Sequence, residues 1–129
     1  MTEGRVAVVD GRRGQPAFSA LAAAQFVEEV DEGFWSVPLS PSVELFTRVT
    51  PIDSVESLLR FMAKIAPNHP HALVDLSGYE EHGTHLRAYD AVDGVLVIAV
   101  AGVDKEKALL AKVEPIPEDK RLGVLLATR

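Results

Sequence analysis

Short, uninterrupted apolar runs recur along the chain, and polar segments separate them. Strong runs cover residues 6–9, 95–100 and 122–126, and a weaker run covers residues 72–76. Within each run the apolar residues are continuous rather than alternating. This pattern predicts strands that are buried on both faces, as in a parallel sheet.

Helical periodicity falls between these runs, and it is clearest over residues 55–65. This segment opens with Asp53 and Glu56 at the spacing of a capping box, and it ends before Pro67. Its predicted apolar face consists of Val55, Leu58, Leu59, Met62 and Ile65.

Three further helices are expected from the same periodicity. One covers residues 18–26 and follows Pro16, a residue favoured in a first helical turn. A short helix is expected over residues 84–91, and another over residues 105–113, where Asp104 is the predicted cap.

The segment from residue 33 to 50 has a different pattern. Residues 34–37 and 43–46 both resemble strands, and Pro38 and Pro41 separate them. At least one of the two is expected to be a strand, at the edge of the sheet, where proline is tolerated.

Strands that alternate with helices predict right-handed β-α-β units and a three-layer α/β sandwich with a mostly parallel sheet. The chain has 129 residues, of which 47% are apolar, enough for one core. We therefore expect a single domain over residues 1–129.

The charge and residue content of the chain indicate which binding partners and which cellular compartment to expect. The chain has 13 Lys and Arg against 19 Asp and Glu, a net charge of −6, so general attraction to nucleic acid or anionic lipid is not expected. It has no cysteine and no apolar stretch long enough to cross a bilayer. The expectation is a soluble, cytoplasmic protein without direct membrane insertion.

Two of the predicted strands end in aspartate, Asp10 in the first and Asp75 in the fourth. Ligands of open parallel sheets bind beyond the carboxyl ends of the strands. If the two strands are neighbours, Asp10, Arg12, Asp75 and Ser77 form a candidate crevice for an anion or another ligand. The alternative is structural: Asp75 caps the turn that follows it, and Asp10 lies in a solvated turn beside the arginines.

The first strand and the residues after it carry a resemblance. Residues 6–14, VAVVDGRRG, lead into SALAA at 19–23 and resemble the strand, Walker A loop and helix that open ParA/MinD-type P-loop ATPases. In that family the loop reads K-G-G-x-G-K-[ST], and its backbone N–H groups and lysines bind phosphates.

The loop of this chain departs from the family pattern. Its degenerate phosphate-loop positions are Gly11, Arg12, Arg13 and Gly14. Arg12 replaces the first lysine, Arg13 and Pro16 occupy glycine positions, and Ala17 stands at the second lysine. Proline lacks an N–H donor, and the missing lysine removes the charge that meets the β and γ phosphates. The resemblance therefore implies a pseudo-ATPase without hydrolytic activity or bound cofactor.

A second alignment of the same segment stays open. Residues 6–10 with Arg12 and Arg13 also resemble the V-L-L-I-D-A-D-x-R-R-P stretch of bacterial tyrosine kinases. In that alignment the Walker A strand is absent altogether. We prefer the first alignment, because loss of a central strand would leave two interior sheet edges to pair.

The C-terminal half resembles the same branch over about 60 residues. Residues 72–75 resemble the Walker B strand that ends in Asp75, residues 89–98 resemble the A-D-G-V-L-L-V-V strand, and 122–126 resemble the L-G-V-V-L-N strand, with Ala127 in place of the asparagine. The resemblance implies a P-loop ATPase-like fold. It also implies a protein partner, either an active ATPase or kinase relative or a second copy in a homodimer, in exopolysaccharide assembly and export or in intracellular positioning.

Other hypotheses remain. The first alternative is a small nucleotide-binding regulator or enzyme that uses Asp10, Arg12 and Asp75. The second is a STAS-like signalling domain, suggested by the L-V-D-L-S-G step at residues 73–78.

Two smaller sets of side chains are also candidates. His82 and His85 have the spacing of a pairwise metal site, although no metal is expected overall. Phe34, Trp35 and Phe46 are core residues or, if their segment is an exposed edge, a protein interface.

Overall fold

The computed structural model describes residues 5–18, 28–31, 33–52, 54–79 and 85–128. Contacts group the chain into two compact units, residues 1–84 and 85–129. The expectation of a single domain stays a prediction. The helix expected over residues 18–26 lies almost entirely outside the described residues.

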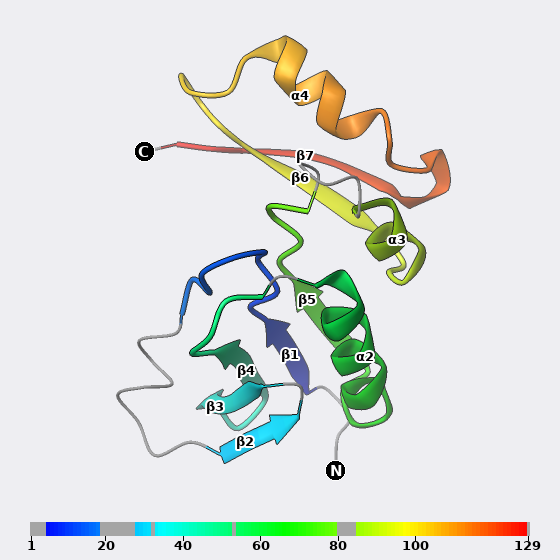
Figure 1. Ribbon diagram of the computed structural model, residues 1–129. Helices are drawn as coiled ribbons and strands as arrows, with labels where there is room; N and C mark the ends of the chain where they lie inside the picture. The colour runs from blue at the N-terminus through cyan, green and yellow to red at the C-terminus, as the bar shows by residue number, and fades with distance from the viewer. Residues whose placement is uncertain (1–4, 19–27, 32, 53, 80–84, 129) are drawn as a thin grey trace. The chain divides into compact units, whose positions relative to one another are not determined.

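The first unit contains a mixed sheet in which β1 lies between β4 and β5. The strand order is β2-β3-β4-β1-β5, and β1 runs parallel to both of its neighbours, while β2, β3 and β4 pair antiparallel. The strands are β1 (Val6–Val9), β2 (Glu28–Asp31), β3 (Phe34–Ser40), β4 (Val43–Arg48) and β5 (His71–Val74) (Figure 1). The apolar runs at residues 6–9 and 72–76 are thus confirmed as neighbouring parallel strands.

The segment from residue 33 to 50 is a hairpin, because both of its strand-like runs are strands. Neither β3 nor β4 lies at an edge of the sheet, so the edge-strand expectation was wrong. Pro38 is accommodated because the β3–β4 register shifts between Pro38 and Ser40.

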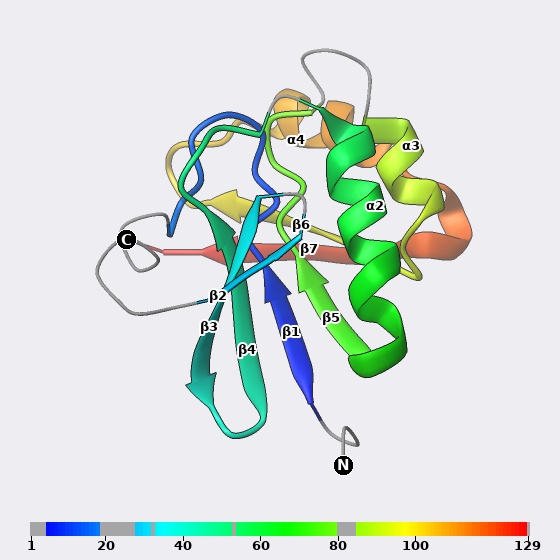
Figure 2. The same cartoon turned by 60° about the horizontal axis from the view of Figure 1, so that its bottom comes forward.

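The helix α2 (Val55–Ile65) confirms the clearest helical prediction and lies against one face of this sheet (Figure 1 and Figure 2). Its N-cap is Ser54, whose side chain accepts a hydrogen bond from Ser57 N at 3.4 Å. The predicted cap, Asp53, lies outside the described residues. Ser54, one residue later, caps the helix because its short hydroxyl reaches a backbone N–H of the first turn. A 3₁₀ turn, η1 (Ala66–Asn68), follows and contains Pro67.

Three aromatic rings hold α2 onto the sheet. Phe61 stacks on Phe34 at 4.1 Å between ring centroids and meets Phe46 edge-on at 5.2 Å. Phe34 and Phe46 are 0% and 2% exposed, and Trp35 is half-buried. The hypothesis that these three residues form an interface is therefore corrected, because Phe34 and Phe46 are core side chains.

The second unit contains a two-stranded parallel sheet of β6 (Val95–Val100) and β7 (Arg121–Ala127), joined through α4 (Glu106–Val113) and the 3₁₀ turn η3 (Glu118–Lys120). Helix α3 (His85–Asp90) precedes β6, and α4 packs against β6. These elements confirm the strands and helices predicted from residue 84 onward. The described chain is thus mixed α/β with mostly parallel strand pairing.

One cap in this unit was wrongly predicted. The residue at the N-cap of α4 is Lys105, which makes no side-chain cap. Asp104 accepts a hydrogen bond from Val100 N at 2.6 Å instead. Its carboxylate therefore stabilises the turn after β6 rather than the first turn of α4.

No helix among the described residues is long and apolar enough to cross a membrane.

Candidate functional site at the carboxyl end of β1

The carboxyl ends of β1 and β5 lie side by side. Val9 pairs with Val74 in the parallel ladder, and Asp75 N donates to Val9 O at 3.0 Å. On the other side, Asp10 N donates to Phe46 O of β4 at 2.8 Å. The two strand-terminal aspartates therefore follow neighbouring strands at one edge of the sheet. Their environments differ, since Asp10 is 1% exposed and Asp75 is exposed.

The carboxylate of Asp10 is held by three donors. Its Oδ2 accepts from Thr47 Oγ1 at 2.7 Å and from Phe18 N at 2.8 Å, and its Oδ1 accepts from Ala17 N at 3.2 Å. Thr47 is itself fully buried. Two backbone N–H groups that follow Pro16 thus point at a carboxylate of the same chain.

Three further N–H groups of the loop are also bonded within the chain. Gly11 N donates to Val9 O at 2.9 Å, and Arg13 N donates to Ser77 O at 2.8 Å. Gly14 and Ile52 exchange two hydrogen bonds, at 2.6 and 2.9 Å. A phosphate-binding loop needs several such donors aimed outward at the ligand. In this loop the N–H groups of Gly11, Arg13, Gly14, Ala17 and Phe18 are bonded to the chain itself.

Gly11 is required by close packing between the two strand ends. A Cβ at this position would lie 2.7 Å from the backbone oxygen of Asp75 and 3.0 Å from Cδ1 of Leu58. Backbone cannot move aside as a flexible side chain can. The glycine that resembles part of a phosphate loop therefore has a structural role in this position.

Asp75 caps the turn that follows β5. Its Oδ1 accepts from Ser77 N at 2.9 Å and from Ser77 Oγ at 2.6 Å. This is the geometry of an Asx turn, in which a strand-terminal aspartate bonds the backbone two residues on.

Tyr79 was not among the predicted site residues, yet it connects the two strand ends. It is fully buried, and its Oη donates to Gly11 O at 2.6 Å. The pKa of the Tyr79 phenol is raised to about 12. Burial is the main cause and the charge of Asp75 adds to it, whereas the charges of Arg13 and Arg48 lower the pKa. The available signal in the sequence was a tyrosine directly after the Ser77-Gly78 turn, at a place where a buried hydroxyl needs a partner.

The arginines of the loop differ in exposure. Arg12 is exposed, whereas Arg13 is half-buried, and a Cβ built on Gly78 would lie 3.0 Å from the Cβ of Arg13. Arg13 therefore lies against the turn after β5.

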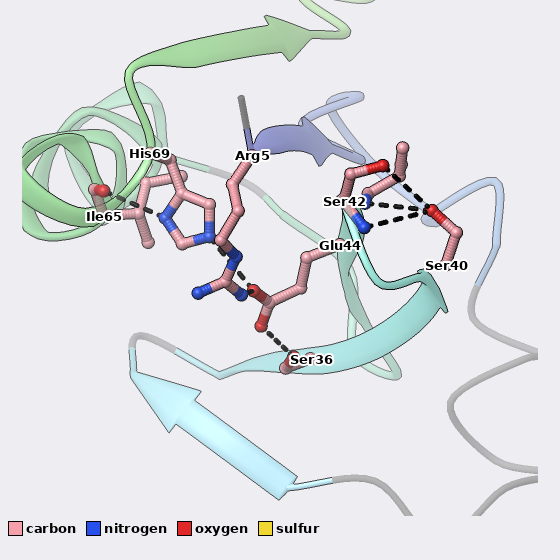
Figure 3. Close-up of polar contacts among 8 residues, drawn as sticks. Arg5, Ser36, Ser40, Ser42, Glu44, Ile65 and His69 are labelled. Atoms are coloured by element: carbon pink, nitrogen blue, oxygen red, sulfur yellow. Dashed lines mark hydrogen bonds and ion pairs between the residues drawn. The ribbon is translucent and has the colours of Figure 1, made fainter. Parts of the chain in front are cut away.

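A second polar cluster, also missed by sequence reasoning, surrounds Glu44 of β4 (Figure 3). The Glu44 carboxylate accepts from Arg5 and from Ser36 Oγ, and His69 Nε2 lies 3.0 Å from its Oε1. Nδ1 of His69 lies 3.1 Å from Ile65 O. Each ring nitrogen of His69 therefore faces an oxygen acceptor.

Burial and the neighbouring polar groups shift the pKa of Glu44 in opposite directions. Burial raises the pKa of its carboxyl, but the hydrogen bonds from Ser36 and His69 and the positive charge of Arg5 outweigh burial and leave the pKa below its ordinary value of 4.5. The carboxylate is therefore ionised at neutral pH. Because Arg5, Glu44 and His69 are far apart in the sequence, local patterns give no signal for this cluster.

The predicted metal pair is only partly described. His85 meets Tyr89 edge-on with ring centroids 5.5 Å apart, and His82 lies outside the described residues. Within the described part of the chain, no group of three or more His, Cys, Asp or Glu side chains could hold a metal ion.

Comparison with protein-family models, with curated proteins and with solved structures finds no match in any of the three. The resemblance to ParA/MinD-type ATPases and bacterial tyrosine kinases therefore stays a prediction from the residues quoted for it.

Proposed function

We propose that the protein is a non-catalytic interaction or regulatory protein whose β1 loop does not bind nucleotide phosphates. The observation that carries this proposal is the bonding of Asp10. Its carboxylate occupies the N–H groups of Ala17 and Phe18, at the place where the family's loop would present donors to phosphate. A phosphate brought to these donors would have to displace an anion that is covalently part of the chain.

Charge adds to this effect. A bound nucleotide would lie beside the buried Asp10 carboxylate, and like charges at such distances repel. Ala17 supplies no ammonium to offset the repulsion, and the exposed cation of the loop is Arg12. The loop thus lacks the features that would make ATP binding favourable.

The pathway within this proposal rests on the sequence resemblance alone. Exopolysaccharide assembly and export, or intracellular positioning, are the settings in which the resembled families act. The P-loop ATPase-like, three-layer form of the fold belongs to the same proposal.

Isothermal titration with ATP and with ADP, each with Mg²⁺, tests the proposal. We expect no saturable heat and no thermal stabilisation of the chain. Stoichiometric binding of either nucleotide to the wild-type chain would overturn the proposal. Loss of that binding in Arg12→Ala would favour the nucleotide-binding regulator or enzyme, which uses Arg12.

A further inference from the structure

The chain contains two Asp-Gly steps, Asp10-Gly11 and Asp93-Gly94. In such a step the backbone nitrogen of the glycine can attack the carboxyl carbon of the aspartate side chain, because glycine has no side chain to hinder the approach. The reaction needs an accessible carboxyl group and a backbone N–H that is free to move. Burial and hydrogen bonding withhold both groups, so the structure decides which of the two steps reacts.

The Asp10-Gly11 step is held at both of its reacting groups. Asp10 is buried, and its carboxylate accepts the three hydrogen bonds described above. Gly11 N donates to Val9 O at 2.9 Å, and the space beside Gly11 is filled by the backbone of Asp75. Attack would break these hydrogen bonds and would move packed backbone. The step is therefore protected in the folded chain.

The Asp93-Gly94 step lies in the turn between α3 and β6 (Figure 1). Asp93 is exposed. Among the residues that the structure describes, no hydrogen bond or ion pair holds the Asp93 carboxylate, and Gly94 N donates to no acceptor. The described part of the chain therefore restrains neither reacting group.

Packing favours glycine at position 94. A Cβ at this position would lie 2.8 Å from Cδ1 of Leu122 and 2.9 Å from its Cγ, so a larger residue would have to displace the Leu122 side chain. The missing side chain lets the start of β6 lie close to β7. The same absence leaves Gly94 N unhindered toward the carboxyl group of Asp93.

We infer that Asp93-Gly94 is a site of spontaneous isoaspartate formation, and that the fold protects Asp10-Gly11 from the same reaction. This inference goes beyond the proposed function and does not depend on it. The modified group is the aspartate itself, and the only co-reactant is water.

The reaction has two steps. First, Gly94 N bonds to Cγ of the protonated Asp93 carboxyl, and the amide hydrogen leaves with the carboxyl OH as one water molecule, which gives a five-membered succinimide. Second, one water molecule adds to a ring carbonyl. Opening of the bond between nitrogen and Cγ restores aspartate, whereas opening at the main-chain carbonyl of Asp93 gives isoaspartate. Water leaves once and returns once, so no oxidant or reductant is needed.

Isoaspartate adds one carbon to the main chain directly before β6, because the chain then runs through Cβ and Cγ of residue 93. Val95, two residues on, pairs with Arg121 at the start of the parallel ladder. The added atom is therefore expected to loosen the start of β6.

Peptide mapping of aged protein tests the inference. The full chain is kept folded at physiological temperature and mildly acidic pH for several weeks and is then digested with trypsin. The two steps fall in separate peptides, residues 6–12 and 88–105. Isoaspartate leaves the peptide mass unchanged but changes its retention, and electron-transfer fragmentation identifies the residue. We expect at least about tenfold more isoaspartate in peptide 88–105 than in peptide 6–12.

The same incubation in urea shows whether the fold causes this difference. In the unfolded chain both Asp-Gly steps are expected to react at similar rates. Equal accumulation in the two peptides of folded protein would overturn the inference. So would a folded chain without isoaspartate at Asp93 when the unfolded chain forms it.

Two variants identify the reacting residue. Asp93→Glu is expected to abolish the product in peptide 88–105, because glutamate would have to close a six-membered ring. Asp90→Glu is the matched control, since Asp90 is exposed in the same peptide but precedes alanine, and it is expected to leave the product unchanged. Product that persists in Asp93→Glu would overturn the inference.

Hydrogen exchange measures the effect of the modification on β6. In aged protein the amides at the start of β6 are expected to exchange faster than in fresh protein, while those of α2 are unchanged. Exchange in β6 that matches the fresh protein would overturn the expected loosening.

Discussion

At the scale of single residues, Asp10 takes the place of an external anion. The difference from a phosphate-binding loop lies in one buried carboxylate and the three donors bonded to it. Substitution of Asp10 by asparagine, which has nearly the same size, tests the role of the carboxylate charge and of its two acceptor oxygens.

Asp10→Asn is predicted to destabilise the fold by about 1–3 kcal/mol. The Asp10 carboxylate accepts from Ala17 N with one oxygen and from Thr47 Oγ1 with the other. Asparagine has only one acceptor oxygen, so its NH₂ group would replace one of these acceptors and leave a donor without its partner. Urea unfolding measures the loss. Asp75→Asn is the matched control, with an expected change within about 0.5 kcal/mol, because its bonds all go to one oxygen in an exposed turn. Equal losses in both variants would contradict this account.

Tyr79→Phe is predicted to cost about 1 kcal/mol at neutral pH, through loss of the hydrogen bond to Gly11 O. The cost should shrink in alkali. The folded pKa of about 12 lies above the ordinary 10.0, so the stabilisation by Tyr79 is complete below pH 10 and is lost as pH rises toward 12.

Unfolding of both proteins between pH 8 and 11 measures this effect. By pH 11, the difference in unfolding free energy should have fallen by about 1 kcal/mol. A difference that stays constant with pH would show that Tyr79 ionises as readily in the folded chain as in the unfolded chain.

At the scale of elements, the Glu44 cluster links β4 to the residue before β1 and to the end of the α2–η1 segment. Glu44→Gln is predicted to destabilise the fold by about 1–3 kcal/mol at pH 7, because Arg5 and His69 lose their charged partner. Since the folded pKa of Glu44 is lowered, its stabilisation is present above pH 4.5 and is lost as pH falls through the folded pKa.

Unfolding measured from pH 7 to pH 3 checks the Glu44 prediction. The gap between wild type and Glu44→Gln should narrow toward the acid end. Glu118→Gln, at an exposed position, is the control and should follow the wild type throughout. A gap that widens as pH falls would contradict the assigned role of the carboxylate.

Strands and helices are also the elements that apolar patterns in the sequence could predict. The runs at residues 6–9, 72–76, 95–100 and 122–126 predicted the positions of strands correctly. The expected burial on both faces was wrong for β5, β6 and β7, whose side chains are largely exposed. Helix α2 was also predictable, since its periodicity matches one buried face.

The sequence could not predict which side chains would meet across long separations. Asp10 with Thr47 and Tyr79 with Gly11 are contacts between residues 37 and 68 positions apart. Caps were also missed, because neighbouring polar residues compete: Ser54 caps α2, and Asp104 bonds to the strand before α4. Such choices depend on tertiary geometry rather than on local pattern.

At the scale of the whole molecule, the two units suggest different roles. The first unit has an aromatic core and a loop whose donors are bonded internally. The second unit buries few apolar side chains among its described residues and exposes many on β6 and β7. The proposed function assigns no nucleotide to the first unit.

The central claim is that the chain itself occupies the donors of the β1 loop. Amide NMR spectra recorded with and without ATP and Mg²⁺ test it most directly, because Arg13, Gly14, Ala17 and Phe18 each report through their own N–H. We predict slow hydrogen exchange at these amides and no saturable shift on adding nucleotide. Fast exchange, together with saturable shifts at Ala17 and Phe18, would show a loop open to phosphate and would contradict the account.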